Sequence, residues 1–260
     1  MNNKKLNINW WWIKSLKVNK KYLIELKNIS LTFNSGKTYV LKDISFWVKP
    51  WEVVSIIWMN WSWKSSLLKV ISWIYKQSSW EVIKNCKKIS YVPQKINIDN
   101  TFPIKVYEFI KIFNDKIKDE NIKNLLKKFW AENLFDKKTS NLSWWEFQKM
   151  LIVSSILSNP ELIILDEPTA WIDIVWEEKF YELIAETKKI FPNLSIILVS
   201  HNINLVYKNS DKVICLHENN FCCHGTPHEL QKNDDIKNIF WKFILPYEHH
   251  PHKKDEHENI

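Results

Sequence analysis

The stretch VVSIIWMNWSWKSSLLKVISWI, from Val53 to Ile74, decides the fold. Its first five residues form a continuous apolar run, which is typical of a strand buried on both faces of a parallel sheet. A polar loop follows, and from Ser65 the apolar residues recur at helical spacing. We therefore expect a strand, a loop and a helix in direct succession.

The rest of the chain repeats this alternation of strands and helices. The runs LIIL and LSIILV, at 162–165 and 194–199, predict two more buried strands, each next to a helical segment. The expected strands cover residues 22–29, 31–33, 39–41, 44–48, 53–57, 88–92, 162–165, 194–199, 213–216 and 220–223, and the expected helices cover 65–74, 103–135, 147–157 and 175–190. This order predicts an α/β fold with a parallel sheet.

The overall composition is that of an ordinary globular protein. The chain has 260 residues, of which 45% are hydrophobic and 25% charged, so a disordered chain or a small disulfide scaffold is excluded. The four cysteines, which are Cys86, Cys215, Cys222 and Cys223, form no CxxC pair, so we expect a reduced, cytoplasmic chain. A net charge of +8 favours an anionic partner only weakly, because the lysines are scattered. No apolar run reaches the ~18 residues of a membrane-spanning helix.

One feature of the composition is anomalous: there are 16 Trp and only 2 Gly. Glycine usually makes up about 7% of residues, and the two counts together come close to that share. Some bacterial lineages read the codon UGA as glycine, whereas a common translation table reads it as tryptophan. We therefore hypothesise that most of the tryptophans are glycines in the cell. The alternative is a protein that is simply rich in tryptophan.

The loop after the first buried strand tests this hypothesis. Residues 58–66 read WMNWSWKSS, and with glycine for tryptophan they become GMNGSGKSS, the phosphate-binding pattern G-x-x-x-x-G-K-[ST] between a strand and a helix. Glycine suits this loop because its backbone N–H groups must converge on phosphate oxygens, and positive φ costs other residues about 1–2 kcal/mol. In such a loop Lys64 reaches the phosphates and Ser65 ligates Mg²⁺. The alternative is an aromatic surface loop.

Further segments resemble the ATP-binding subunits of ATP-binding cassette (ABC) transporters. The residues NLSWWEFQ at 141–148 are similar to the family signature LSGGE-x-Q, and LIILDE at 162–167 is similar to the Walker B strand. The segments PTAWID at 168–173, VSH at 199–201 and VPQ at 92–94 resemble the D-loop, the switch histidine and the Q-loop. Tryptophans at 51, 58, 61, 63, 73, 80, 144, 145 and 171 stand where the family pattern has glycine, whereas Trp47, Trp130, Trp241 and the cluster 10–12 stay open.

The resemblance implies a fold and a division of the chain. The fold class is a P-loop (RecA-like) parallel core with an antiparallel β subdomain and an inserted helical subdomain. The expected units are an N-terminal extension at 1–21, an ABC domain at 22–232 with its helical subdomain at about 95–157, and a C-terminal segment with a His-rich tail at 233–260.

The resemblance also implies roles for single residues in ATP hydrolysis. Asp166 would hold Mg²⁺, and Glu167 would orient the attacking water; a helix-capping carboxylate is the alternative for Glu167. Gln94 would contact Mg²⁺ and the water, and His201 would hydrogen-bond the γ-phosphate. Phe33 would stack on adenine, unless it is an ordinary core residue.

ATP in this family lies between two domains arranged head to tail, so a second copy would complete each site. The residues expected to bind the nucleotide are Phe33, Trp58, Met59, Asn60, Trp61, Ser62, Trp63, Lys64, Ser65, Ser66, Ser143, Trp144, Trp145, Glu146 and Asp173. We expect ATP and Mg²⁺ as cofactors, a homodimer, a membrane permease as partner, an extracytoplasmic metal-binding protein as indirect partner, no nucleic acid, and a peripheral location at the cytoplasmic face of the membrane.

The cargo is less clearly indicated. The segments 213–230 and 175–184 resemble the zinc and manganese uptake branch of the family, and the tail contains His249, His250, His252 and His257. Histidine-rich tracts bind Zn²⁺; a solvated chain end is the alternative. Cys222, Cys223 and His224 suit a metal, but cysteines packed in the core are the simpler interpretation. We expect an importer of zinc or manganese.

Three alternatives remain open. The chain would be an ABC ATPase for another solute if its neighbouring permease and binding protein indicated one. It would be a non-hydrolysing, degenerate ABC module if the tryptophans were genuine. The codons at these positions distinguish the two cases directly, because UGG throughout would mean genuine tryptophan. A soluble ABC ATPase of DNA repair or translation is disfavoured, because 260 residues leave no room for tandem cassettes or long coiled-coil insertions.

Overall fold

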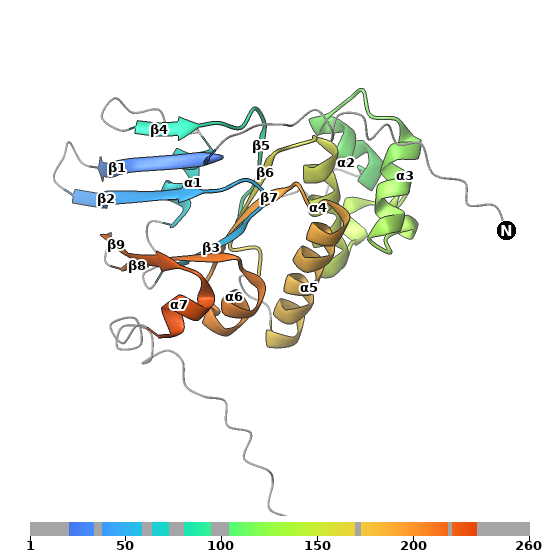
Figure 1. Ribbon diagram of the computed structural model, residues 1–260. Helices are drawn as coiled ribbons and strands as arrows, with labels where there is room; N and C mark the ends of the chain where they lie inside the picture. Colours follow the sequence, from blue (N-terminus) through green and yellow to red (C-terminus); the bar gives the residue numbers. More distant parts are fainter. Residues whose placement is uncertain are drawn as a thin grey trace, which may run out of the picture.

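The computed structural model describes residues 21–33, 38–58, 64–72, 81–94, 104–169, 173–217 and 220–232. Within these ranges the strands lie in the order β4-β1-β2-β9-β8-β3-β7-β6-β5 (Figure 1). The strands are β1 (Ile24–Phe33), β2 (Thr38–Val48), β3 (Val53–Trp58), β4 (Glu81–Lys84), β5 (Ile89–Val92), β6 (Leu162–Asp166), β7 (Ser195–Ser200), β8 (Lys212–His217) and β9 (Asn220–Gly225). Strands β8, β3, β7, β6 and β5 run parallel, whereas β4, β1 and β2 pair antiparallel.

Helices cover this sheet and form one end of the molecule (Figure 1). They are α1 (Lys64–Ile71), α2 (Val106–Phe113), α3 (Asp119–Lys128), α4 (Trp144–Leu157), α5 (Ile174–Ile190), α6 (Ile203–Asn209) and α7 (Pro227–Gln231), with short 3-10 turns at Glu132–Leu134 and Thr139–Asn141. The predicted α/β class with a parallel core and an antiparallel β portion is confirmed.

The buried strands alternate between two hydrophobic cores, as strand geometry requires. In β3, Val53 and Ile57 pack with residues of α2 to α6, whereas Val54 and Ile56 face α1 and the antiparallel strands. The apolar residues on both sides of β3 are therefore explained by burial on both faces. The same alternation fixes the register of β6 and β7, so that side chains at their carboxyl ends meet at one edge.

Several element boundaries differ from the sequence-based expectation. Instead of four short strands at 22–48 there are two long ones, because Asn28 and Asp43 adopt positive φ and the strands continue across shifts in register. The expected helix at 103–135 is divided into α2 and α3, because the backbone becomes extended at Asn114, just after α2, and is extended again at Lys118, just before α3. The sequence analysis missed β4, α6 and α7, which are all short.

Six described residues other than glycine have positive φ: Asn28, Asp43, Trp51, Trp130, Asn159 and Glu167. Asparagine and aspartate tolerate this conformation because their short polar side chains form local hydrogen bonds. Tryptophan has no such compensation. The two tryptophans and Glu167 are therefore the positions where the backbone conformation calls for an explanation.

Candidate functional site

Two buried carboxylates lie at the carboxyl end of β6. Asp166 is the last residue of the strand and is 2% exposed, and Glu167 follows it and is 8% exposed. The apolar residues Leu162 to Leu165 place them there, because they anchor the strand in both cores. Ligands of open parallel sheets bind outside the carboxyl ends of the strands, so this edge is the candidate site.

Each carboxylate has a partner from β5 or the residues just after it. The Tyr91 hydroxyl donates to Oδ2 of Asp166 at 2.8 Å, and the Gln94 amide donates from Nε2 to Oε2 of Glu167 at 2.7 Å. Parallel pairing of β5 with β6, with Val92 opposite Leu165, brings these groups together. Gln94 and Glu167, two of the predicted site residues, are thus in direct contact.

The backbone at Glu167 has φ of 44°, in the left-handed region. Non-glycine residues there cost about 1–3 kcal/mol and cluster at functional sites, where the surrounding structure holds them. The hydrogen bond from Gln94 and the burial of the side chain supply such constraints. Glu167 is therefore held in one orientation at the edge of the sheet.

His201 lies at the same edge, directly after β7. In the register of the sheet Ser200 is opposite Ile57 of β3, and Val199 is opposite Asp166 of β6. The His201 side chain is exposed and is therefore accessible to a ligand at this edge. The ends of β3, β6 and β7 thus converge where the sequence predicts the nucleotide.

The predicted phosphate loop falls between β3 and α1 in the chain. The predicted residues Met59, Asn60, Trp61, Ser62 and Trp63 lie outside the described residues. Trp58 ends β3 and Lys64 and Ser65 begin α1, but their side chains are not among those described, and the same holds for Phe33 at the end of β1. Ser66 is half-buried in the first turn of α1. The predicted strand before these residues and the predicted helix after them are confirmed.

The signature segment forms the N-terminus of α4. Ser143 caps the helix: its Oγ accepts from the Glu146 N–H at 3.3 Å, and the Glu146 carboxylate accepts from the Ser143 N–H at 2.9 Å. Burial works against the charge of Glu146, but hydrogen bonds from Lys137 and Ser143 outweigh it and lower the pKa of its carboxyl. Lys137 Nζ donates to that carboxylate at 2.7 Å. This capping box starts α4 at Trp144, three residues before the predicted start.

Aromatic rings connect the starts of α4 and α5. The ring centroids of Trp144 and Trp145 are 6.1 Å apart, and those of Trp145 and Trp176 are also 6.1 Å apart. Asp173 caps α5, because its carboxylate accepts from the Trp176 N–H at 3.0 Å. The predicted residues Ser143, Trp144, Trp145, Glu146 and Asp173 therefore lie at two neighbouring helix N-termini, where backbone N–H groups favour anions.

Two groups at this edge were missed by the sequence analysis. Tyr91 stands two residues before Pro93 in a strand of alternating pattern, which gave no signal of a contact with Asp166. Glu177 is 5% exposed and accepts hydrogen bonds from Thr169 and Asn202. Its sequence context, two acidic residues in a row near the start of a helix, is that of a solvated face.

The carboxylates, the amide and the hydroxyls of this edge suit Mg²⁺. Mg²⁺ prefers oxygen ligands and is usually held by one or two carboxylates together with substrate phosphates. Asp166 and Glu167 supply two buried carboxylates at one strand end, and Gln94 supplies an amide beside them. The donor set therefore fits the ion that the sequence predicts.

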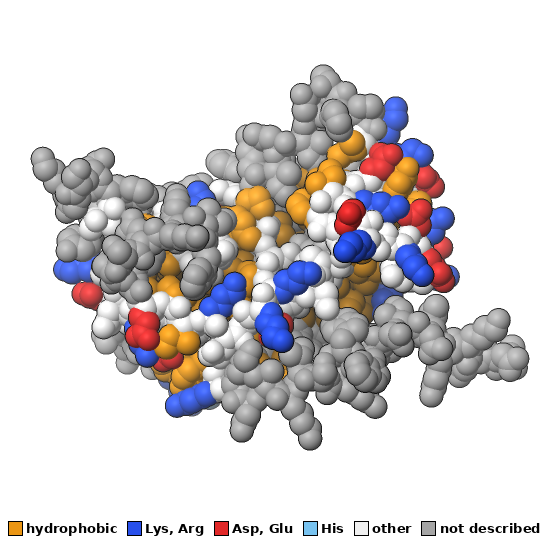
Figure 2. Space-filling model, turned by 90° about the horizontal axis from the view of Figure 1, so that it is seen from above, with side chains coloured by type: hydrophobic (Ala, Val, Ile, Leu, Met, Phe, Trp, Pro, Cys, Tyr) orange, Lys and Arg blue, Asp and Glu red, His pale blue; other side chains and the backbone are white. Residues whose placement is uncertain are grey.

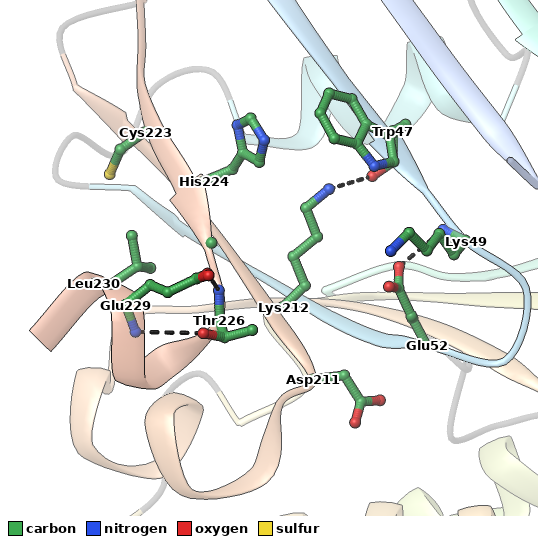
Figure 3. Close-up of a pocket in the computed structure, with 11 residues that line it drawn as sticks. Trp47, Lys49, Glu52, Asp211, Lys212, Cys223, His224, Thr226, Glu229 and Leu230 are labelled. Carbon is green, nitrogen blue, oxygen red and sulfur yellow. Dashed lines mark hydrogen bonds between the residues drawn. The ribbon is translucent and has the colours of Figure 1, made fainter. Parts of the chain in front are cut away.

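A separate cavity of about 540 Å³ lies between β2, β8, β9 and α7 (Figure 3). Lys212 Nζ donates to the Trp47 carbonyl at 2.8 Å and lies 4.2 Å from the Trp47 ring centroid. Burial lowers the pKa of Lys212 to about 8, and burial with the nearby Lys212 charge lowers that of His224. Cys223 and His224 line the cavity, but the described residues contain no group of three metal-ligating side chains.

The charged side chains are interspersed on the face seen in Figure 2, with lysines and acidic residues side by side. This agrees with the scattered lysines of the sequence. Among the described residues, no helix has the length and apolar character needed to cross a membrane. The His-rich tail lies outside the described residues.

Comparison with known proteins decides the family. The sequence model described as ABC transporter matches residues 41–170. A zinc import ATP-binding protein, ZnuC, of Rickettsia bellii is 36% identical over 90% of this chain and 99% of its own length. The ZnuC protein of Buchnera aphidicola subsp. Baizongia pistaciae is 37% identical over 89% of this chain and 98% of its own.

The chain belongs to the ABC transporter family.

Solved structures agree with this assignment. The structure of cbiO1 from Clostridium perfringens, part of the ABC transporter complex cbiONQ, superposes with a TM-score of 0.72 at 25% identity and covers 87% of this chain and 97% of that one. A nucleotide-free ATP-binding cassette from an ABC transporter gives a TM-score of 0.69 at 19% identity, covering 85% and 95%. The chain is thus an ATP-binding ABC subunit, an ATPase whose hydrolysis is coupled to transport through a membrane permease.

Proposed function

We propose that this subunit hydrolyses ATP at the carboxyl edge of β6 and thereby drives zinc import. The proposed hydrolytic site is supported above all by the buried Asp166–Glu167 pair and by the hydrogen bond that Gln94 donates to Glu167. The zinc assignment is supported by ZnuC relatives that are 34–37% identical over most of the chain. Manganese, or another solute, is the second candidate cargo.

Phosphoryl transfer needs alignment and charge neutralisation more than covalent chemistry. In our proposal the Glu167 carboxylate orients the attacking water, and the Gln94 amide holds Glu167 in place. The His201 ring contacts the γ-phosphate from the end of β7. Lys64 neutralises phosphate charge, and Phe33 stacks on adenine.

Asp166, Ser65 and Gln94 would hold Mg²⁺, which when bound supplies positive charge to the phosphate oxygens. The Tyr91 hydroxyl fixes the rotamer of Asp166 through its hydrogen bond to Oδ2. One carboxylate oxygen is thereby occupied by Tyr91, and the carboxylate plane is set.

We propose that two copies of the chain bind ATP between them, with Ser143, Trp144, Trp145, Glu146 and Asp173 facing the nucleotide of the other copy. The paired N-termini of α4 and α5 support this, because they present N–H groups on one surface. The permease would be gripped by the helical subdomain at about 95–157, which would place the ABC domain at 22–232 on the cytoplasmic face of the membrane.

We also propose that glycine replaces tryptophan at most of these positions in the cell. Trp51 and Trp130 support this, because their φ values of 70° and 50° are typical of glycine. Trp51 follows Pro50, and proline followed by a residue at positive φ is the pattern of a type II turn with glycine in third place.

The end of α3 has the hydrogen bonds of a Schellman motif. The Ala131 N–H donates to the Leu126 carbonyl at 2.9 Å, and the Trp130 N–H donates to the Lys127 carbonyl at 3.1 Å. In this motif the left-handed residue, here Trp130, is usually glycine. Trp130 is 72% exposed, so its ring gains little from burial. Position 130, which the sequence left open, is therefore included in the proposed replacement.

Transport of radioactive zinc into proteoliposomes tests the proposed function. The native chain, assembled with its permease, is expected to take up zinc only with ATP, and Glu167→Gln is expected to stop uptake. Manganese uptake without zinc uptake would show that manganese, not zinc, is the cargo. Uptake unaffected by Glu167→Gln would overturn the proposed hydrolytic site.

A further inference from the structure

A buried carboxylate near the start of α5 has no place in the mechanism described so far. Glu177 is 5% exposed, whereas the neighbouring Glu178 is exposed. A buried carboxylate is costly unless hydrogen bonds replace its water. The partners of Glu177 therefore indicate what it does.

Both oxygens of Glu177 accept hydrogen bonds from segments that carry proposed site residues. The Thr169 hydroxyl donates to Oε1 at 3.2 Å, and the Asn202 amide donates from Nδ2 to Oε2 at 2.9 Å. Thr169 is two residues after Glu167, and Asn202 directly follows His201. One carboxylate thus bridges the segment after β6 and the segment after β7.

Both bridged residues are themselves fixed. Thr169 is 5% exposed. The Asn202 N–H donates to Ser200 Oγ at 3.1 Å, and the Asn202 carbonyl oxygen accepts from the Leu205 N–H at 3.2 Å as the cap of α6. A displacement of Glu177 would therefore be transmitted to backbone next to the proposed site, not to a loose loop.

Glu177 is not needed to cap its own helix. Asp173 already caps α5, by accepting from the Trp176 N–H. We infer that Glu177 is a positioning residue, which holds the segments of Glu167 and His201 at a fixed separation for hydrolysis. This inference rests on the roles proposed above for these two residues. A displacement of about 1 Å at a catalytic group reduces a rate by ~100-fold.

The test compares Glu177→Ala with Glu177→Gln in the native chain assembled with its permease. Alanine is expected to lower kcat by ~10- to 100-fold, with KM for ATP and the stoichiometry of bound nucleotide nearly unchanged. Glutamine is expected to restore most of kcat, because its oxygen accepts from Asn202 and its amide donates to the Thr169 hydroxyl. A merely structural role would lower the stoichiometry of bound nucleotide instead.

Two further variants serve as controls. Glu178→Gln, at the exposed neighbour, is expected to leave kcat unchanged. Thr169→Val removes one arm of the bridge and is expected to give an intermediate kcat. If Glu177→Ala keeps the native kcat while Glu167→Gln and His201→Ala abolish hydrolysis, the inference is wrong and the proposed function stands. If the latter two variants hydrolyse ATP normally, the proposed function itself fails.

Discussion

The carboxyl edge of β6 and the cavity beside β8 and β9 differ in the charge that each one supports. At the edge of β6, Asp166 and Glu167 are buried and receive hydrogen bonds from Tyr91 and Gln94. In the cavity, burial lowers the pKa of Lys212 and of His224, so this region disfavours positive charge. The first region holds two buried, hydrogen-bonded carboxylates, whereas in the second region burial favours the neutral forms of Lys212 and His224.

This difference shows that a cavity by itself does not identify the functional site. The cavity in Figure 3 has a volume of about 540 Å³, yet Lys212, one of its two lysines, already contacts the Trp47 carbonyl and ring. The proposed hydrolytic site is recognised instead by where the parallel strands end. Variants in the two regions are therefore expected to affect different measurements.

The largest effect is expected at Glu167. Replacement by glutamine keeps the size of the side chain but removes the charge that orients water, and should lower ATP turnover by ~100- to 1,000-fold. ATP binding should persist, because the proposed phosphate contacts are elsewhere. Steady-state phosphate release and equilibrium nucleotide binding measure the two quantities. Lys212→Met, in the cavity, is the matched control and should leave turnover close to native; a comparable loss there would erase the distinction between the regions.

A smaller loss is expected at Tyr91. Phenylalanine removes the hydroxyl that donates to Asp166 Oδ2, and a hydrogen bond to a charged group is worth about 1.5–3 kcal/mol. Turnover should fall by ~10- to 100-fold, because Asp166 loses the hydrogen bond that orients its carboxylate. Kinetics at varied Mg²⁺ concentration check this, since the proposed role is exerted through Asp166. Native turnover at all Mg²⁺ concentrations would show that Tyr91 only packs.

Stability variants separate Trp130, at the end of α3, from Trp47, which lines the cavity. In the chain with tryptophan at every printed position, Trp130→Gly should raise the free energy of unfolding by about 1–2 kcal/mol through relief at φ of 50°. Trp130→Ala removes the ring but keeps the Cβ, so it should gain less. Urea titration measures both.

Trp47→Gly is the matched control, since it lies in β2 and its ring contacts Tyr22, His224 and Lys212. It should lower the free energy of unfolding by about 2 kcal/mol. Equal stability of the alanine and glycine variants at position 130 would contradict the conformational argument.

The smallest effect concerns pH. Because the pKa of Lys212 falls to about 8 in the folded chain, the unfolded chain binds more protons between pH 8 and about 10.5. The contribution of Lys212 to stability should therefore rise with pH across this window, by about 1 kcal/mol or less after solvent screening. Urea titrations at pH 8 and pH 10 should show the rise in the native chain and its loss in Lys212→Met; an unchanged slope in the variant would refute it.

The sequence predicts the parallel core because each buried strand is a short apolar run beside a helical pattern. It places Asp166, Glu167, Gln94 and His201 at strand ends, and the structure brings the first three together. Long β1 and β2 were not predicted, since their continuity depends on Asn28 and Asp43 at positive φ.

Tertiary contacts explain what else the sequence could not predict. Glu177 becomes a buried bridge only when β6 and β7 place Thr169 and Asn202 beside it. The contact of Tyr91 with Asp166 likewise depends on the pairing of β5 with β6. The positive φ of Trp130 and the hydrogen bonds that end α3 likewise become visible only in the folded chain.

The central claim is that glycine stands at the proposed phosphate-binding positions between β3 and α1. Tandem mass spectrometry of tryptic peptides from the native protein tests it most directly, with peptide 43–64 covering the loop and peptide 129–137 covering position 130. We predict glycine at 58, 61, 63 and 130. Tryptophan at 61 and 63 in native protein that hydrolyses ATP would contradict the account.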